Sequence, residues 1–357
     1  MRAILNIILM LFAFTLFGQK TEKDKQLEEA TSLIFTNPEK SVQISTRMLQ
    51  EAKDYKTKII ALSKLVNAQM VLGDISQVIR NCNQGIEMAK ENEDKINQIR
   101  FLSMLGNQYQ QINMNADAKK NLDEAENLIN ATPLPKDLLF IQGNVYNVKG
   151  IVFKSELNCE FSIKYFDKAL DVYNRLPAED VTVTNRLLID IQKAHCLESI
   201  GKIQEAEKLY NEVLDSKDNG LGYNKYFASV GMVDIYLKRK DLDRAEQVLK
   251  TINVKDFIQY DSELTSQYYR LMAQNSYLRK NFKSYLYYFD KYNGSLLQIS
   301  KSQNEMIEKL VIDDNANYIQ KSNKAVMMNL IIISILIIVL SLLVLFFYRF
   351  SVKKTAE

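Results

Sequence analysis

An apolar stretch of 23 residues near the C-terminus, residues 326–348, constrains this chain more than any other feature. It contains no charged residue and is bracketed by Lys324 and Arg349. A helix of this length, rising about 1.5 Å per residue, measures about 35 Å and can cross the roughly 30 Å hydrocarbon core of a bilayer. We therefore expect a single transmembrane helix over 325–348, followed by a short cytoplasmic tail, 349–357.

The N-terminus predicts export of the region before this helix. Arg2 precedes an apolar run over residues 4–17, which is too short to span a bilayer easily and is typical of a secretory signal. We expect a signal peptide over 1–18, with an uncleaved signal anchor as the alternative. Basic residues in the tail agree with a cytoplasmic C-terminus. The predicted location is the cytoplasmic (inner) membrane, single-pass, with the region from residue 19 to residue 324 periplasmic or otherwise extracytoplasmic.

Charge and motifs exclude several classes of function. The 46 basic and 43 acidic residues are interspersed, and without a basic block we expect no direct nucleic-acid contact. Cys82, Cys159 and Cys196 lie far apart, which favours buried small hydrophobic residues over a disulfide framework. The sequence has no phosphate-binding glycine loop, nucleophile elbow or His/Cys cluster. We therefore expect no enzyme activity, no cofactor and no metal site.

The exported region contains an internal repeat of helical character. The chain has only 11 Gly and 4 Pro, and its apolar residues recur at three- and four-residue spacing, which predicts an all-α structure. One unit contains Leu105, Gly106, Tyr109, Ala118, Leu122 and Ala125, and the next contains Gly150, Phe153, Ser162, Phe166 and Ala169. Pro133 and Pro177 close the two units in the same phase. Each unit is interpreted as two antiparallel helices that must stack on neighbours to bury their apolar faces.

These positions resemble the tetratricopeptide repeat, or TPR. The resemblance covers about residues 24–293 in some seven units, within a predicted domain over 19–293. Two departures are the absence of Trp and a spacing of 36–44 residues instead of about 34. The resemblance implies a TPR-like α-solenoid of about seven helical hairpins, which would bind a protein or peptide on the concave face formed by the first helices.

The candidate groove residues occupy equivalent positions on the predicted first helices. They are Ser63, Asn67, Ser103, Asn107, Gln110, Asn147, Lys154, His195, Glu198, Asp234 and Tyr269. The Asn, Ser and Gln side chains suit hydrogen bonding to a peptide backbone; the alternative is that they are solvated helix positions. Some relatives grip a terminal carboxylate with paired Lys and Asn, and no matching set is found. The tyrosines between 268 and 292 are a second candidate surface or, alternatively, core packing.

Helical spacing continues over 294–324, which predicts a connecting helix leading into the transmembrane segment. This architecture resembles the sensor region of bacterial membrane-bound regulators of the histidine-kinase or helix-turn-helix type. Only nine residues follow the apolar stretch, so we expect no effector domain in this chain.

Three functions remain open: a membrane-anchored periplasmic scaffold that binds a protein or peptide, the sensor half of a signalling regulator with a separate cytoplasmic partner, and an accessory factor in envelope assembly or secretion. The expected partners are a protein or peptide and the membrane, and the sequence leaves the oligomeric state open.

Overall fold

The structure is a computed structural model that describes residues 22–156, 158–216, 223–258 and 261–354. It divides into two compact units, of which the first ends at Gln303 and the second begins at Asn304. All regular secondary structure in the described ranges is helical. The predicted signal peptide over 1–18 and the last three residues of the tail lie outside them.

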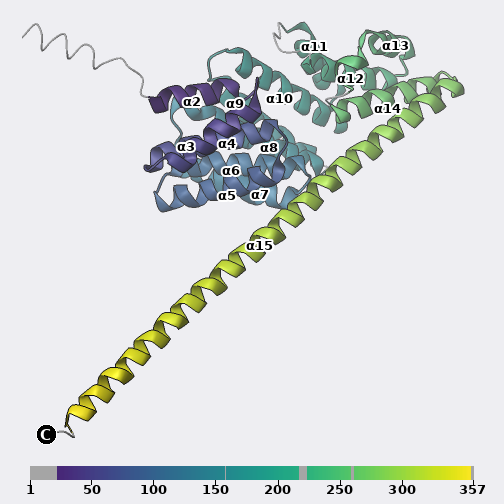
Figure 1. Cartoon of the computed structure of the whole chain (residues 1–357). Coiled ribbons are helices and arrows are strands. Elements are labelled where there is room, and N and C mark those ends of the chain that lie inside the picture. The colour runs from purple at the N-terminus through teal and green to yellow at the C-terminus, as the bar shows by residue number, and fades with distance from the viewer. Residues whose placement is uncertain (1–21, 157, 217–222, 259–260, 355–357) are drawn as a thin grey trace, which may run out of the picture. The chain divides into compact units, whose positions relative to one another are not determined.

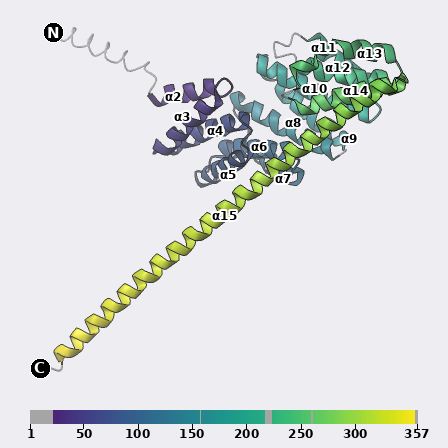
Figure 2. The ribbon, with the colours of Figure 1, turned by 45° about the vertical axis from the view of Figure 1, so that its right-hand side comes forward.

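The first unit consists of helical hairpins that follow one another in chain order (Figures 1 and 2). Their helices are α2 (Glu22–Leu33) and α3 (Pro38–Glu51), α4 (Tyr55–Val71) and α5 (Ile75–Glu91), α6 (Lys95–Gln111) and α7 (Asn115–Ala131), α8 (Leu139–Ser155) and α9 (Cys159–Tyr173), α10 (Asp180–Ser199) and α11 (Ile203–Asp215), α12 (Tyr223–Lys238) and α13 (Leu242–Thr251), and α14 (Ser262–Leu278) with the start of α15 (Phe282–Lys354). Two short 3-10 turns, η1 (Lys136–Leu138) and η2 (Val254–Asp256), precede α8 and α14. The architecture confirms the predicted TPR-like solenoid.

Helix starts are set by polar caps. Asn37 accepts a hydrogen bond from the Lys40 amide, and Pro38 occupies the first turn of α3, where a missing N–H costs nothing. Asp94 caps α6 in the same way, with its Oδ1 3.0 Å from the Asn97 amide. Tight turns then reverse the chain within a hairpin, and Gly73 adopts φ 68° in the turn between α4 and α5. Such a positive φ is accessible to glycine without steric cost.

Close contacts between small and large residues hold the helices of a hairpin together. A Cβ added to Gly106 on α6 would lie 2.6 Å from Leu122 Cγ on α7, and one added to Gly143 on α8 would lie 2.6 Å from the Tyr173 ring on α9. A Cβ added to Gly150 on α8 would likewise meet the Phe166 ring on α9 and would have no room. The glycines therefore let one helix approach until a large side chain of its neighbour fills the gap, as the repeat pattern predicts.

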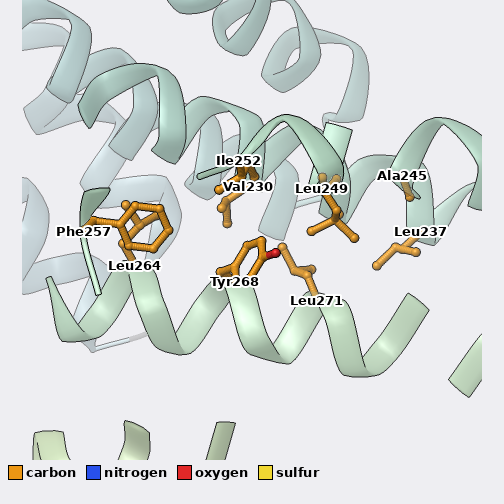
Figure 3. Packing of buried hydrophobic residues seen from close by; sticks show 10 residues of the cluster. Val230, Leu237, Ala245, Leu249, Ile252, Phe257, Leu264, Tyr268 and Leu271 are labelled. Atoms are coloured by element: carbon orange, nitrogen blue, oxygen red, sulfur yellow. The ribbon is translucent and has the colours of Figure 1, made fainter. Parts of the chain in front are cut away.

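Neighbouring hairpins share a continuous core. Figure 3 shows Val230 and Leu237 of α12 packed with Leu249 of α13 and with Tyr268 and Leu271 of α14. Each of these side chains is at most 8% exposed. Because each first helix is covered by the following hairpin, no hairpin has to bury its apolar surface alone.

An ionic cluster also ties α7, α8 and α9 together. Lys149, whose side chain is 5% exposed, lies 2.5 Å from Asp123 Oδ1 and also contacts Glu126. Lys168 pairs with the other oxygen of Glu126 at 3.0 Å. A buried ammonium is stable only when it is paired with an anion. The Asp123 and Glu126 carboxylates are therefore needed for Lys149 to be buried in its charged form.

The described part of the second unit, from Asn304 onwards, is helical and forms part of α15. Within the described residues, one segment is long and apolar enough to cross a membrane, Tyr318–Leu343, with a mean hydropathy of 3.0. Its apolar side chains are uncovered, and Ile331, Ile335 and Leu340 are each more than half exposed. This segment overlaps the span predicted over 325–348.

Candidate functional site

A large hollow in the first unit lies between α4, α6 and α8. It has a volume of about 1120 Å³ and is lined only by these three first helices and the preceding turns. Five of the residues selected from the sequence line it: Ser63, Asn67, Ser103, Asn107 and Asn147. The structure therefore gathers these five side chains, which come from three successive repeats, around one groove, called the first groove below.

Amide side chains form one part of the polar lining of the first groove. Asn67, Asn107 and Asn147 occupy equivalent positions on the three helices, and each amide offers both donors and an acceptor. Asn97 and Asn144 also line the groove, but Asn97 donates to Asp94 and Asn144 accepts from the Tyr173 hydroxyl. Asn147 Oδ1 is buried and has no hydrogen-bond partner. An unpaired buried acceptor is costly, so a rotation of this side chain that brought the oxygen to an N–H donor would be favourable.

Apolar side chains form a second part of the wall. Ile59, Ile60, Met70, Met104, Leu138, Phe140 and Ile141 all line the first groove. Phe140 is 42% exposed although it is a large aromatic side chain. A groove with an apolar wall and a few placed polar groups is the usual composition of a ligand site.

Charged residues in this groove were not selected from the sequence. Lys64 and Arg100 line it on adjacent first helices, and Arg100 donates to Asn97 Oδ1 at 2.7 Å. Burial lowers the pKa of Lys64, and the nearby Arg100 charge lowers it further. Burial also lowers the pKa of Arg100, while Asp94 and Asp137 act in the opposite direction. In the sequence, only the position of Lys64 could have indicated that it lines the groove, because it directly follows the candidate Ser63 on the same predicted helix.

Lys154 and His195 line a second cavity of about 690 Å³, away from the first groove. Its wall also contains Asn158, Cys159 and Glu160 at the start of α9, Ser199 and Ile200 at the end of α10, and Glu263 and Gln267 of α14. Lys154 donates to Gln192 Oε1 at 2.5 Å. His195 Nδ1 lies 3.1 Å from the Tyr210 hydroxyl. Burial lowers the pKa of His195 to about 3, and the charge of Lys154 acts in the same direction.

Glu198 and Asp234 are held in a network of side chains instead of lining either cavity. Lys238 donates to Glu198 Oε1 at 2.5 Å and lies 3.2 Å from Asp234 Oδ2, and Arg270 lies 3.4 Å from Asp234 Oδ1. The Glu198 side chain is 3% exposed. Burial raises its pKa to about 7, and its hydrogen bond with Asp234 adds to this. Burial acts to raise the pKa of Asp234, but the Glu198 hydrogen bond and the Arg270 and Lys238 charges lower it overall.

Gln110 and Tyr269 lie elsewhere. Gln110 is near the C-terminal end of α6 and does not line the first groove. Tyr269 is half-buried and packs edge-on against Tyr268, with ring centroids 5.5 Å apart. The tyrosine-rich stretch is divided, because Tyr268 is 8% exposed in the core whereas Tyr277 and Tyr287 are 56% and 59% exposed.

Comparison with solved structures identifies the fold. The apo form of RapI superimposes with a TM-score of 0.55 at 14% identity, over 76% of each chain. The chain has the fold of a tetratricopeptide repeat protein. A tetratricopeptide repeat protein from Parabacteroides merdae ATCC 43184 matches at 13% identity and a TM-score of 0.50, over 82% of this chain and 99% of that one. NprR in complex with its cognate peptide NprX matches at 12% identity and a TM-score of 0.55, over 82% and 84%.

No protein-family model and no curated protein matches the sequence. The likeness therefore rests on the arrangement of the helices and extends to the fold alone.

Proposed function

We propose that this protein binds a peptide, or an extended segment of a protein partner, in the first groove. The observation that carries the proposal is that Asn67, Asn107 and Asn147, which occupy equivalent positions in three successive repeats, all line a single groove with apolar side chains in its wall. In this proposal the protein binds its partner and catalyses no reaction.

The spacing of the helices suits an extended chain. Helix α6 packs against α8, and helices packed side by side lie roughly 8–10 Å apart. This distance is close to the length of three residues of an extended peptide at about 3.3 Å each. Amides on consecutive first helices would therefore meet the peptide backbone at about every third residue. A side-chain amide can pair with both the N–H and the C=O of one residue, so recognition of the backbone leaves the intervening side chains to contact the apolar wall.

Two similar folds support a peptide as ligand. NprR has been solved with its cognate peptide NprX, and a Rap protein has been solved in complex with Competence and Sporulation Factor at a TM-score of 0.50 to this chain. Both complexes are made by proteins of the same helical arrangement. They do not define the sequence that this groove would recognise.

The proposal includes an anchor in the membrane. The signal-like N-terminus, 1–18, and the apolar segment around 325–348 would place the repeat domain outside the cytoplasm and the tail, 349–357, inside. In this arrangement the ligand is an extracytoplasmic peptide or protein. The oligomeric state follows from none of these features.

A second candidate function is the sensor half of a transmembrane regulator that acts through a separate cytoplasmic partner. Helix α15 favours it, because one helix, Phe282–Lys354, contains both the end of the last hairpin and the apolar segment. The solved structures with a similar fold include the apo form of the quorum sensor NprR from B. thuringiensis, at 13% identity and a TM-score of 0.54. Under this reading the same groove binds the signal.

Photocrosslinking tests the groove. A photoreactive amino acid replaces Met104 in the full-length chain, and cells are irradiated before the membranes are solubilised and the attached peptides identified. We expect a discrete adduct that is lost in the Asn107→Arg, Asn147→Arg variant, because it removes two of the amides and places two long cations in the groove. Asn127→Arg is the matched control, since Asn127 is exposed on α7 and does not line the groove. An adduct unchanged by the double substitution would refute the assignment of the groove.

A further inference from the structure

The last hairpin of the repeat domain keeps an uncovered apolar face. Within the described residues each earlier hairpin is followed by another, whereas the hairpin of α14 and the start of α15 is followed by continuous helix. The large apolar side chains exposed at this end are Tyr277 and Leu278 on α14 and Phe282, Leu286, Tyr287, Phe289, Leu296 and Leu297 on α15. The terminal repeat of a solenoid needs a polar outer face to remain soluble, and an exposed apolar patch of this kind marks an interaction site.

Apolar residues of α15 recur every seven positions along this face. They form two lines, Phe282, Phe289 and Leu296, and, three positions later, Tyr285, Tyr292 and Ile299. This is the a and d spacing of helices that pack against each other along their length. After a break at Gln303, the same spacing continues in the sequence with Met306 and Leu310. The pattern therefore predicts that a second helix covers this line, called the α15 seam below.

Charged residues are kept away from the α15 seam. Between residues 282 and 303 they are Lys283, Asp290, Lys291 and Lys301. All four fall at the b, c or f positions of the seven-residue pattern, which point away from a partner helix. The e and g positions that flank the seam are uncharged: Leu286, Tyr288, Asn293, Ser295, Ser300 and Ser302. Two copies of α15 can therefore approach each other without bringing like charges together.

Helix α14 covers one flank of the seam and leaves the other open. On the covered flank, Ser295 is 7% exposed, and the ring centroids of Tyr285 and Tyr277 lie 5.4 Å apart. On the open flank, Leu286 is 63% exposed. A hollow of about 240 Å³ is lined by Arg270, Ala273, Gln274 and Tyr277 of α14 and by Tyr285, Phe289 and Tyr292 of α15. Such a hollow can receive a side chain of a partner helix, as holes receive knobs in a coiled coil.

We propose that this face is a dimer interface, in which α15 of one copy packs in parallel against α15 of a second copy. A second copy fits because the seam is complementary to itself: two copies in register place apolar residues opposite apolar residues along the whole line. The parallel direction rests on the proposed membrane anchor, since two copies in one membrane have the same orientation. With α14 on the outer flank of each α15, the contact is a four-helix arrangement.

The apolar area agrees with a stable dimer. Aromatic side chains bury about 150–250 Å² each when fully covered, so a half-exposed large side chain offers about 100 Å². Tyr277, Phe282, Leu286, Phe289 and Leu296 together offer about 500 Å² per copy. A standard interface buries about 800 Å² per partner, of which about 60% is apolar. The uncovered face therefore supplies the apolar share of an interface of ordinary size.

Photocrosslinking of the purified full-length protein in non-ionic detergent tests the interface. The photoreactive residue p-benzoylphenylalanine replaces Phe289 in one variant and Tyr287 in the matched control. Both side chains are exposed on the same turn of α15, but Tyr287 lies at an f position, away from the seam. We expect a covalent dimer from position 289, with the linked peptide mapped by mass spectrometry to α15 of the second copy, and no such dimer from position 287.

Charge substitutions provide a second measurement. Phe289→Glu would place two carboxylates against each other across the dimer axis, and should weaken dimerisation at least about tenfold in native mass spectrometry. Tyr287→Glu should leave the dimer unchanged. Because both side chains are exposed, we expect the helical content in circular dichroism to be the same in both variants and the wild type.

Four results would overturn the dimer: a wild type that stays monomeric at all concentrations, a dimer that Phe289→Glu leaves unchanged, equal crosslinking from positions 287 and 289, or adducts in cells that join position 289 to a different protein. The last result would assign the face to that protein. The interface goes beyond the proposed peptide binding, and the first groove lies on other helices. Its own crosslinking experiment therefore succeeds or fails independently of these results.

Discussion

Gly106 offers the sharpest test of how the hairpins are packed. In an exposed helix, replacing Gly by Ala stabilises the helix by about 1 kcal/mol. Here the new Cβ would lie 2.6 Å from Leu122 Cγ, 2.8 Å from Leu122 Cδ2 and 3.3 Å from the Ala118 carbonyl oxygen. Carbon atoms in contact prefer about 3.5–4.0 Å, so the Leu122 side chain is roughly 1 Å too close. Leu122 is fully buried and has nowhere to move.

The expected net effect of Gly106→Ala is a loss of about 1–2 kcal/mol in the stability of this hairpin. Because Leu122 is fully buried and cannot move away, we expect the overpacking cost in the upper part of its usual range, at about 2–3 kcal/mol. The gain in helix propensity offsets about 1 kcal/mol of this strain. Amide hydrogen exchange in α6 and α7 should therefore become about 5- to 30-fold faster, because these amides exchange through local opening. Mass spectrometry of the full-length protein in detergent measures this helix by helix.

Gly294→Ala and a double-mutant cycle complete the test. Gly294 lies in α15, and a Cβ there would meet nothing within 4 Å, so this substitution should slow exchange or leave it unchanged. Leu122→Ala alone removes buried carbon and should cost about 2–5 kcal/mol. In that background Gly106→Ala should be neutral or stabilising, since the space has been freed. If Gly106→Ala slowed exchange as Gly294→Ala does, or if it cost the same with and without Leu122, the packing argument would be refuted.

Four further outcomes are expected. His195 stays neutral in the fold, because its pKa is about 3, below the unfolded value of about 6.5. Its contribution to stability is therefore full above pH 6.5 and is lost as the pH falls. In urea unfolding, His195→Gln should reduce the loss of stability between pH 6.5 and pH 4. The pH dependence due to Glu198 has the opposite sign, because its pKa is raised to about 7. Its contribution to stability is present below about pH 4.5 and is lost as the pH rises through 7. The difference in unfolding free energy between wild type and Glu198→Gln should therefore shrink from pH 5 to pH 8, and a constant difference would contradict the shift. Lys149→Ala leaves Glu126 buried with one cation fewer and should lower the stability to urea by about 2 kcal/mol, whereas Lys208→Ala, at an exposed ion pair, should change it by less than about 0.5 kcal/mol. Protease added to intact spheroplasts should digest the repeat domain and spare an epitope fused after residue 357; survival of the repeat domain with loss of the epitope would invert the proposed topology.

Much of the fold could be predicted from particular residues. Gly106 and Leu122, and Gly150 and Phe166, were assigned to facing helices from their spacing alone, and the structure brings each pair into contact. The signal is strong because a helix of 3.6 residues per turn requires small and large residues at set intervals wherever two helices touch. Ser63, Asn67, Ser103, Asn107 and Asn147 share a groove for the same reason.

The second half of the site could not be predicted in this way. Glu198 and Asp234 occupy positions equivalent to those of the groove residues, yet they are enclosed with Lys238, Arg270 and Tyr210. Lys64 and Arg100 were passed over, although they line the first groove. Equivalent positions have equivalent exposure only when every repeat stacks at the same angle, and these repeats vary in length.

The amino-acid order by itself determined the helices, their pairing into repeats and the apolar segment at 326–348, because these depend on periodicities along the chain that short-range geometry imposes. The tertiary structure alone decided which repeated positions remain open, that Asn147 keeps an unpaired acceptor, and that Glu198 and Asp234 are enclosed with Lys238 and Arg270. These depend on the angle and distance between successive hairpins, which arise from the sum of many contacts and leave no local mark in the sequence.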